Sequence, residues 1–234
     1  KMDVPLVPGE LGELAQAMEA MRARLEGRDY IEGYVRALTH ELKSPVAAIR
    51  GAAELLQDDL PGADRALFAG QIEQQVQRIQ RLIDRLLELS KLEQRQSLLV
   101  DAPTSLRDCA EAAIAESQAR ARQKNVAITL QGDGTSGPFE AALVALAIGN
   151  LLDNAIDFSP AGSTVRVTLA GGRIAVTDAG PGVPDYALPR LGERFFSTPR
   201  PNGERTGSGL GLAIVRQIMA LHHGTLHVAT LDRA

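Results

Sequence analysis

Two kinds of residue pattern in the 234-residue sequence have types and spacings suited to chemistry, and the first is the adjacent pair His40-Glu41. A neutral imidazole is a good nucleophile near pH 7, and a neighbouring carboxylate can orient it or accept its proton. An exposed helical histidine is more often only a solvated surface residue. Pro45 indicates a functional role for this segment, because a proline inside a helix costs about 3 kcal/mol and leaves the Glu41 carbonyl without its usual hydrogen-bond donor. His40 is therefore a candidate nucleophile.

The second kind of pattern consists of amide and glycine segments in the C-terminal half. Asn150 and Asn154 share one face of a predicted helix, where they can hydrogen-bond a neighbour or hold a ligand. The segment from Asp178 to Gly182 (DAGPG) is, in isolation, an ordinary turn after a predicted strand. The segment from Gly207 to Gly211 (GSGLG) opens a predicted helix, whose N–H groups and dipole favour phosphate. It has neither the Lys-Ser/Thr end of a P-loop nor the preceding strand of a dinucleotide fingerprint.

Composition excludes several classes of protein. There are 25 basic and 29 acidic residues, a net charge of -4, which argues against a nucleic-acid partner. The single cysteine, Cys109, excludes a framework of intrachain disulfides. No apolar run approaches the roughly 20 residues that cross a bilayer, so we expect no membrane contact within this sequence.

The elements that must position these residues divide into two halves. Apolar residues at alternating gaps of three and four over residues 31–56 and 72–86 predict two amphipathic helices, separated by the turn at Pro61-Gly62. In that register His40 lies opposite the apolar seam. A hairpin leaves its seam half covered, so we predict dimerisation into a four-helix bundle, with a purely structural coiled coil as the alternative. An earlier apolar series, residues 11–25, is out of register by one residue, and we interpret the break at Gly27 as a signalling joint.

In the second half the sequence predicts alternating helices and strands, as in an α/β domain. The pattern predicts helices over 105–123, with Ser105 as the N-cap, over 139–157 and over 210–221. It predicts strands over 126–130, 164–169, 173–178 and 225–231, and a long mobile loop over 185–206.

These residues resemble a known family. The stretch from Thr39 to Pro45 (THELKSP) resembles the H-box of sensor histidine kinases, whose histidine becomes phosphorylated, and residues 34–54 look especially like the CreC-type kinases. In order and spacing, the three later segments resemble the N, G1 and G2 boxes of the Bergerat-type (GHKL) ATPase fold. The segment Arg194-Phe195-Phe196 stands at that family's F-box, on the loop that closes over ATP.

The resemblance implies a multidomain fold: an all-α helical hairpin, dimeric as a four-helix bundle, followed by an α/β sandwich ATP-binding domain of Bergerat (GHKL) type. Residues 1–28 would form the C-terminal part of a HAMP-like signalling helix, 29–98 the dimerisation and histidine-phosphotransfer hairpin, and 99–234 the catalytic domain, without its last strand. The implied function is ATP-dependent autophosphorylation of His40, then phosphotransfer to an aspartate of a response regulator. The implied protein is a homodimeric cytoplasmic portion of an inner-membrane sensor, joined to the membrane only through upstream segments absent from this chain.

The resemblance also implies roles for individual residues. Asn154 would bind Mg²⁺, with Asn150 beside it. Asp178 would accept a hydrogen bond from the adenine amino group. Two positions depart from the family: Asp157 stands where relatives often carry Lys, and Ser44 replaces a Thr or Asn linked to dephosphorylation. The catalytic set implied is His40, Glu41 and Ser44, and the ATP-binding set is Asn150, Asn154, Phe158, Asp178, Gly180, Gly182, Arg194, Gly207, Gly209, Leu210 and Gly211.

Two alternative functions stay open at this point. A chaperone- or gyrase-type GHKL ATPase places a Glu near Asn150 to activate water, and an amide cannot act as that base. A catalytically silent signalling scaffold would keep the fold without turnover, although the intact His40, Asn154 and Asp178 argue against it.

Overall fold

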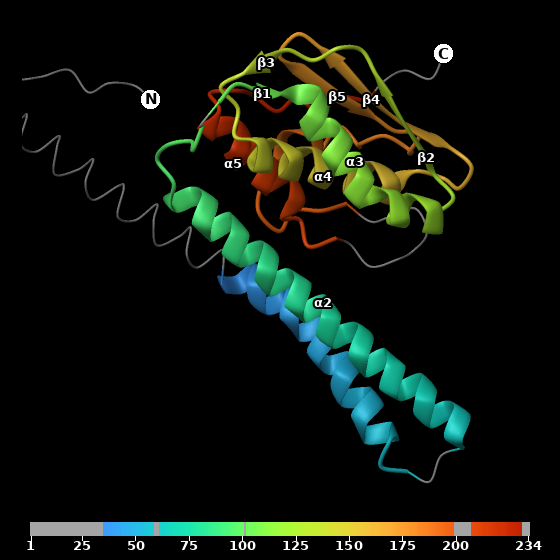
Figure 1. Ribbon diagram of the computed structural model, residues 1–234. Coiled ribbons are helices and arrows are strands. Elements are labelled where there is room, and N and C mark those ends of the chain that lie inside the picture. Colours follow the sequence, from blue (N-terminus) through green and yellow to red (C-terminus); the bar gives the residue numbers. More distant parts are fainter. Residues whose placement is uncertain (1–34, 59–60, 101, 199–206, 231–234) are drawn as a thin grey trace, which may run out of the picture. The chain divides into compact units, whose positions relative to one another are not determined.

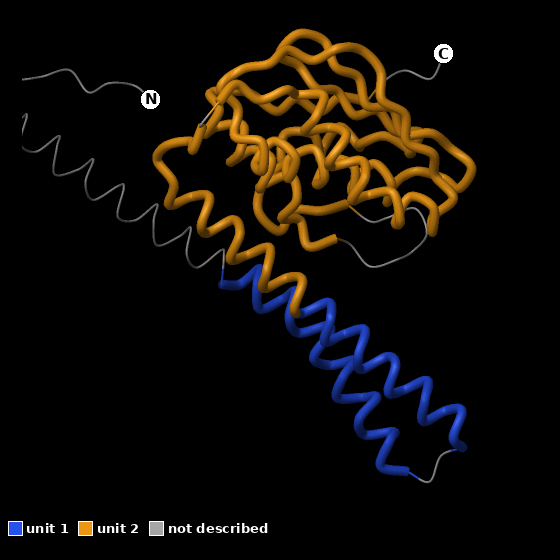
Figure 2. Tube along the Cα trace, viewed as in Figure 1, with its two compact units in different colours: residues 1–79 blue, residues 80–234 orange. Residues whose placement is uncertain are grey.

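The computed structural model describes residues 35–58, 61–100, 102–198 and 207–230. The chain divides into two compact units between Ile79 and Gln80, inside one long helix (Figure 2). The predicted HAMP-like segment 1–28 and the register break at Gly27 lie outside the described residues.

The first unit contains the predicted helical hairpin. A helix covers residues 35–55, and α2 (Gly62–Gln94) runs on into the second unit (Figure 1). The first helix continues through Pro45, whose side chain is fully buried, so the apolar register predicts the helix correctly despite the proline. Apolar side chains stay exposed on both helices. Val35 and Val76 belong to the predicted apolar seam, whereas Val46, Leu55 and Leu67 lie outside it.

The second unit begins its α/β fold with α3 (Leu106–Gln123). The hydroxyl of Ser105 accepts a hydrogen bond from the Asp108 backbone N–H at 3.3 Å, which satisfies one of the free donors of the first turn. Arg120 and Arg122 lie in its last turn, where cations stabilise the negative end of the helix dipole. The capping predicted from the sequence is confirmed.

A three-stranded sheet forms one layer of this unit. Strand β4 (Thr164–Ala170) lies in the centre, parallel to β2 (Ala127–Gln131) and antiparallel to β5 (Arg173–Thr177). The register pairs Ile128 with Val165, and Val167 with Val176. Alternate residues of β4 are buried because one face of the sheet packs against the helices.

The helices α3, α4 (Ala141–Phe158) and α5 (Gly211–Leu221) form the second layer (Figure 1). Helix α4 packs between α3 and α5 and also contacts β4 and β5. By length and composition α4 is apolar enough to cross a membrane, but half of that stretch is buried inside the unit, as in the core helix of a folded domain. The core is built from α3, α4 and the sheet, and its largest members include Ile148, Leu152, Ile156, Val165 and Val167.

The structure corrects part of the sequence prediction. The strand predicted over 225–231 is wrong for the described residues, because 225–230 make no backbone ladder. The Thr230 hydroxyl accepts a hydrogen bond from the Val183 N–H at 3.1 Å and donates one to the Val183 carbonyl at 3.3 Å. The sequence also missed the short antiparallel pair β1 (Thr104–Ser105) and β3 (Ser136–Gly137). Within the predicted loop, a 3-10 helix forms at Leu188–Arg190.

Candidate active site

The candidate nucleophile lies on an exposed helical surface. His40 is exposed in the helix over 35–55, whereas Glu41, the next residue, is partly buried. The Glu41 carboxylate faces Arg78 of α2, with 3.8 Å between Oε2 and Nη2. Ser44, one turn further on, is also partly buried. The imidazole is thus open to a reactant while its neighbouring carboxylate is held by a cation.

In the second unit, a polar face on the apolar helix α4 carries the two asparagines. Asn150 is 7% exposed, and its amide nitrogen donates to the Leu146 carbonyl at 3.0 Å. Its oxygen points toward the start of α5, since a Cβ built on Gly211 would lie 3.1 Å from it. Asn154, one turn later, is partly exposed and lies on the same face. The structure therefore brings the asparagine segment and the last glycine of GSGLG together.

The turn from Asp178 to Gly182 brings its backbone close to neighbouring atoms. Asp178 Oδ1 accepts the Gly180 N–H at 2.7 Å, and the residue is exposed at the end of β5. A Cβ on Gly180 would lie 2.6 Å from that oxygen and 3.0 Å from the Phe158 carbonyl. Gly182 adopts a φ of 80°. Only glycine fits at Gly180 without displacing Phe158, so the turn packs against the end of α4.

The GSGLG segment packs against the first residues of the predicted lid. Gly209 has a φ of 65°, and its carbonyl accepts the Phe195 N–H at 3.1 Å. Leu210 is fully buried, so its side chain belongs to the core, and as N-cap of α5 it makes no side-chain capping bond. Gly207 begins this described segment and is partly exposed.

Arg194, the predicted lid cation, is paired with a carboxylate. Its guanidinium bonds the carboxylate of Glu93 near the end of α2. Burial raises the pKa of Glu93 and lowers the pKa of Arg194, so desolvation disfavours the charged form of each partner.

A second charged contact fixes the start of α4. The Glu140 carboxylate receives two hydrogen bonds from Arg95, each 2.8 Å, and one from the Leu99 N–H at 2.8 Å. Burial by itself raises the pKa of Glu140, but the Arg95 guanidinium and the Leu99 N–H outweigh it and hold the pKa below its usual value. The Glu140 N–H donates to His222 at 3.2 Å, which ties α4 to the end of α5.

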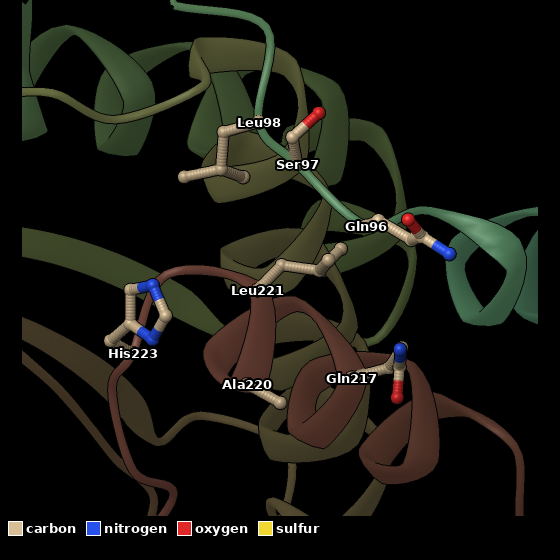
Figure 3. A pocket seen from close by; sticks show the side chains of 7 residues that line it. All are labelled: Gln96, Ser97, Leu98, Gln217, Ala220, Leu221 and His223. Carbon is tan, nitrogen blue, oxygen red and sulfur yellow. The ribbon is translucent and has the colours of Figure 1, made fainter.

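A cavity of about 390 Å³ lies elsewhere in this unit, between the segment after α2 and the end of α5 (Figure 3). None of its residues belongs to the predicted site, and none belongs to the asparagine or glycine segments. Its lining is Gln96, Ser97, Leu98, Gln217, Ala220, Leu221 and His223. It is therefore not the candidate nucleotide site.

Three observations indicate that a nucleotide fits the asparagine and glycine segments. The α5 N-terminus follows a glycine run and lacks a side-chain cap, so its N–H groups suit an anion. The Ser208 hydroxyl is buried without a hydrogen-bond partner among the described residues. One oxygen of Asp178 receives the Gly180 N–H, and the described residues supply no donor to the other. The described residues contain no cluster of three His, Cys, Asp or Glu suited to a metal.

Sequence reasoning missed the charged partners of this face. Arg85 and Arg120 contact Asp153, and Lys124 joins Arg120 at Asp157. The sequence shows only that Asp153 and Asp157 are acidic residues on an apolar helix, and a buried acidic side chain needs a cation nearby. The sequence does not say which of its 25 basic residues supplies it.

Two protein-family models match the parts of the chain that carry these residues. The model described as His Kinase A (phospho-acceptor) domain matches residues 32–95 and includes His40. The model described as histidine kinase-, DNA gyrase B-, and HSP90-like ATPase matches residues 140–233 and includes the asparagine and glycine segments. Sensor protein CreC of Escherichia coli (strain K12) is 44% identical over 222 residues, 92% of this chain and 46% of the relative. The chain belongs to the sensor histidine kinases.

Other histidine kinases agree with this assignment. Sensor protein QseC of Salmonella typhi is 38% identical over 235 residues, which cover 96% of this chain and 51% of the relative. The chain spans about half the length of the curated relatives it matches. Family membership is consistent with the predicted ATP-binding character of the C-terminal half and with the CreC-type resemblance.

Solved structures show that the fold is that of histidine kinases. Histidine kinase ThkA in complex with response regulator protein TrrA has a TM-score of 0.68 and 18% identity, covering 89% of this chain and 60% of that one. Acinetobacter baumannii histidine kinase AdeS has a TM-score of 0.56 and 23% identity, covering 78% and 86%. The predicted fold class, a helical hairpin followed by an α/β ATPase domain, is confirmed.

The contact between Gly209 and the lid predicts a sensitive position. A Cβ on Gly209 would lie 2.5 Å from the Phe195 carbonyl carbon and 2.6 Å from the Phe196 nitrogen, both backbone atoms. We expect Gly209→Ala to lower the free energy of unfolding by about 2 kcal/mol, because alanine disfavours a positive φ and the lid backbone must move. Thermal unfolding and ATP titration of the variant measure both effects.

Gly149→Ala is the matched control, since a Cβ there meets nothing within 4 Å and the residue lies inside α4. It should raise stability by about 0.5–1 kcal/mol, as for alanine in a helix interior. A Gly209→Ala protein that melts like the wild type would contradict the packing described for Gly209.

Proposed function

We propose that this chain is the phosphoryl-transfer portion of a two-component sensor kinase, which uses ATP and Mg²⁺ to phosphorylate His40 and then passes the phosphoryl group to an aspartate of a response regulator. The observation that carries the proposal is an exposed histidine beside a held carboxylate, in a chain that also has the asparagine and glycine cradle. Membership of the histidine kinases supports it. In this proposal residues 29–98 form the phosphotransfer hairpin and residues 99–234 the catalytic domain.

The proposed chemistry assigns roles to groups of this chain. An imidazole nitrogen of His40 attacks the γ-phosphorus, the bond from that phosphorus to its bridging oxygen breaks, and ADP leaves with the electron pair. The imidazole proton passes to Glu41, and Ser44 borders the phosphorylated ring. Catalysis of such a loose transition state rests mainly on positioning and on neutralising charge. Bound Mg²⁺ would supply charge neutralisation, with Asn154 and Asn150 as its protein ligands.

The nucleotide contacts follow from the geometry of the second unit. Asp178 would accept a hydrogen bond from the adenine amino group through the carboxylate oxygen that does not bond the Gly180 N–H. Phe158 and Gly182 would lie near the base. The backbone from Gly207 to Gly211, including Leu210, would face the phosphates at the start of α5. Arg194 would then exchange Glu93 for a phosphate oxygen.

We also propose that the chain acts as a homodimer. Exposed residues of the apolar seam, Val35 and Val76 at 52% exposure each, support this, because a second hairpin would cover them. The histidine-kinase relatives are named sensor proteins, which supports a cytoplasmic portion of an inner-membrane sensor.

Radiolabelled ATP tests the proposed reaction. Incubation with [γ-³²P]ATP and Mg²⁺ should give label that is acid-labile and base-stable, as expected for a P–N bond, and peptide mapping should place it on His40. Release of inorganic phosphate without protein labelling would instead support an ATPase, and binding of ATP without either product would support a silent scaffold.

The Glu93–Arg194 pair leads to a prediction about ATP affinity. Glu93→Gln removes the charge that competes with phosphate for Arg194, so the KM for ATP should fall by up to about fivefold, the roughly 1 kcal/mol that an ion pair near a surface contributes. Steady-state autophosphorylation at varied ATP measures the change. Glu73→Gln, on the same helix at a carboxylate that accepts from Gln77, is the control. An unchanged or higher KM in Glu93→Gln would argue against competition at Arg194.

A further inference from the structure

The acidic residues of α4 present a problem for a nucleotide site. Asp153 and Asp157 lie on the face that carries Asn150 and Asn154, at successive helical spacings of three and four. The Asp157 side chain is 2% exposed and that of Asp153 is 30% exposed. Two carboxylates on this face would repel a triphosphate bound beside Asn154, and a buried carboxylate keeps its charge only when it is paired.

One arginine of the neighbouring helix α3 contacts both carboxylates. Arg120 Nη2 lies 2.6 Å from Asp157 Oδ1, and its Nη1 lies 3.7 Å from Asp153 Oδ1. The planar guanidinium with several donors suits such a bridge, whereas a lysine ammonium acts as a point charge. Arg120 therefore ties the two acidic positions of α4 to α3, which packs along it in the core.

Two further cations lie close to these carboxylates. Lys124 Nζ lies 3.4 Å from Asp157 Oδ1, and Arg85 Nη2 lies 3.2 Å from Asp153 Oδ2. Arg85 comes from α2, the helix that runs through both units, whereas Arg120 comes from α3, which packs against α4. Arg120 is thus the cation whose guanidinium reaches both carboxylates.

We propose that Arg120 is a positioning residue for the nucleotide: by neutralising Asp153 and Asp157 it makes this face of α4 able to accept the triphosphate. The inference rests on the proposed ATP site and adds to it a residue on α3. It also gives a reason why an acidic residue is tolerated at position 157 beside a phosphate site: a cation comes from the adjacent helix.

The test compares ligands that differ in phosphate charge. Dissociation constants of ATP, ADP and adenosine are measured by calorimetry, with Mg²⁺ present, for the full chain and for Arg120→Ala. In Arg120→Ala each carboxylate keeps one cation and loses the other, so its negative charge is less fully neutralised. The resulting repulsion should weaken the binding of ATP roughly tenfold, that of ADP less, and that of adenosine by no more than about twofold, because the effect scales with ligand charge. In autophosphorylation, the KM for ATP should rise more than kcat falls.

A second variant keeps the test decisive if Arg120→Ala is poorly folded. Arg120→Ala combined with Asp157→Asn removes the uncovered buried charge, so it should fold well and recover most of the ATP affinity. Arg120→Lys should retain part of it. Arg107→Ala is the matched control: its side chain is 39% exposed, as is that of Arg120, but it pairs with Glu111 and Asp133 instead of α4. It should leave all three dissociation constants unchanged.

Two results would overturn the proposal. If the affinities for ATP, ADP and adenosine all fell equally and the melting temperature fell too, Arg120 would be only a structural link between α3 and α4. Failure of the double variant to bind ATP better than Arg120→Ala would exclude charge neutralisation at Asp157. If the wild-type chain labels His40 and either result is found, this proposal fails alone; if the wild-type chain does not bind ATP, the proposed function fails and this inference with it.

Discussion

The His40→Ala variant is expected to lose autophosphorylation completely while its affinity for ATP stays within about twofold of the wild type, as for distant independent sites. The imidazole is the only group of the proposed reaction that alanine removes, and no other side chain from Thr39 to Pro45 is an imidazole. His40 belongs to the unit that ends at Ile79, whereas the asparagine and glycine segments belong to the other. Labelling with radioactive ATP and calorimetry measure the two properties on one protein sample.

The control for this experiment is His222→Ala. His222 lies at the end of α5, where it accepts the Glu140 N–H, so its loss should reduce stability without removing the phospho-acceptor. Label that persists in His40→Ala would show that another residue is the acceptor. Loss of ATP binding in His40→Ala, with melting unchanged, would contradict the assignment of the two functions to separate parts of the chain.

The elements that the sequence predicted well are those specified by local patterns. The helix over 35–55 follows from apolar spacing that persists across Pro45, and the start of α3 follows from a hydroxyl three residues before the N–H it caps. Strands β4 and β5 follow from β-branched residues on both sides of Gly171-Gly172. In each case the signal and the structure lie within a few residues of each other in the chain.

The errors arise where long-range contacts decide. The segment 225–230 contains residues favourable to strands, but a strand forms only with a partner, and these residues contact Val183 through a single hydroxyl. The short pair β1–β3 brings Thr104 next to Gly137, a contact that no local pattern signals. Such pairings depend on where the rest of the chain has placed the backbone.

The candidate site divides in the same way. Motif spacing identified Asn150 and the glycines, and the structure places the Asn150 oxygen toward Gly211, and Phe158 against Gly180. The electrostatics of the site were not predictable, because the cations facing Asp153 and Asp157 come from two other helices. Charge neutralisation depends on three-dimensional neighbours, so a single sequence shows the acid but not its partner.

Asn154→Asp is expected to keep the fold and yet reduce the autophosphorylation rate by roughly 100-fold or more, the usual cost of losing one preorganised polar group in an active site. Asn154 is partly exposed on α4, so a carboxylate of the same shape can be solvated and the helix is retained. The new charge would join Asp153 and Asp157 on a face whose carboxylates already engage Arg85, Arg120 and Lys124, and it would repel the triphosphate that the neutral amide tolerates. Circular dichroism and melting check the fold, and labelling of His40 at saturating ATP and varied Mg²⁺ measures the rate.

Asn125→Asp, in the turn after α3, is the control for the same chemical change away from the site. An Asn154→Asp protein that labels His40 at a near-wild-type rate would refute the proposed role of Asn154 in holding the metal and nucleotide.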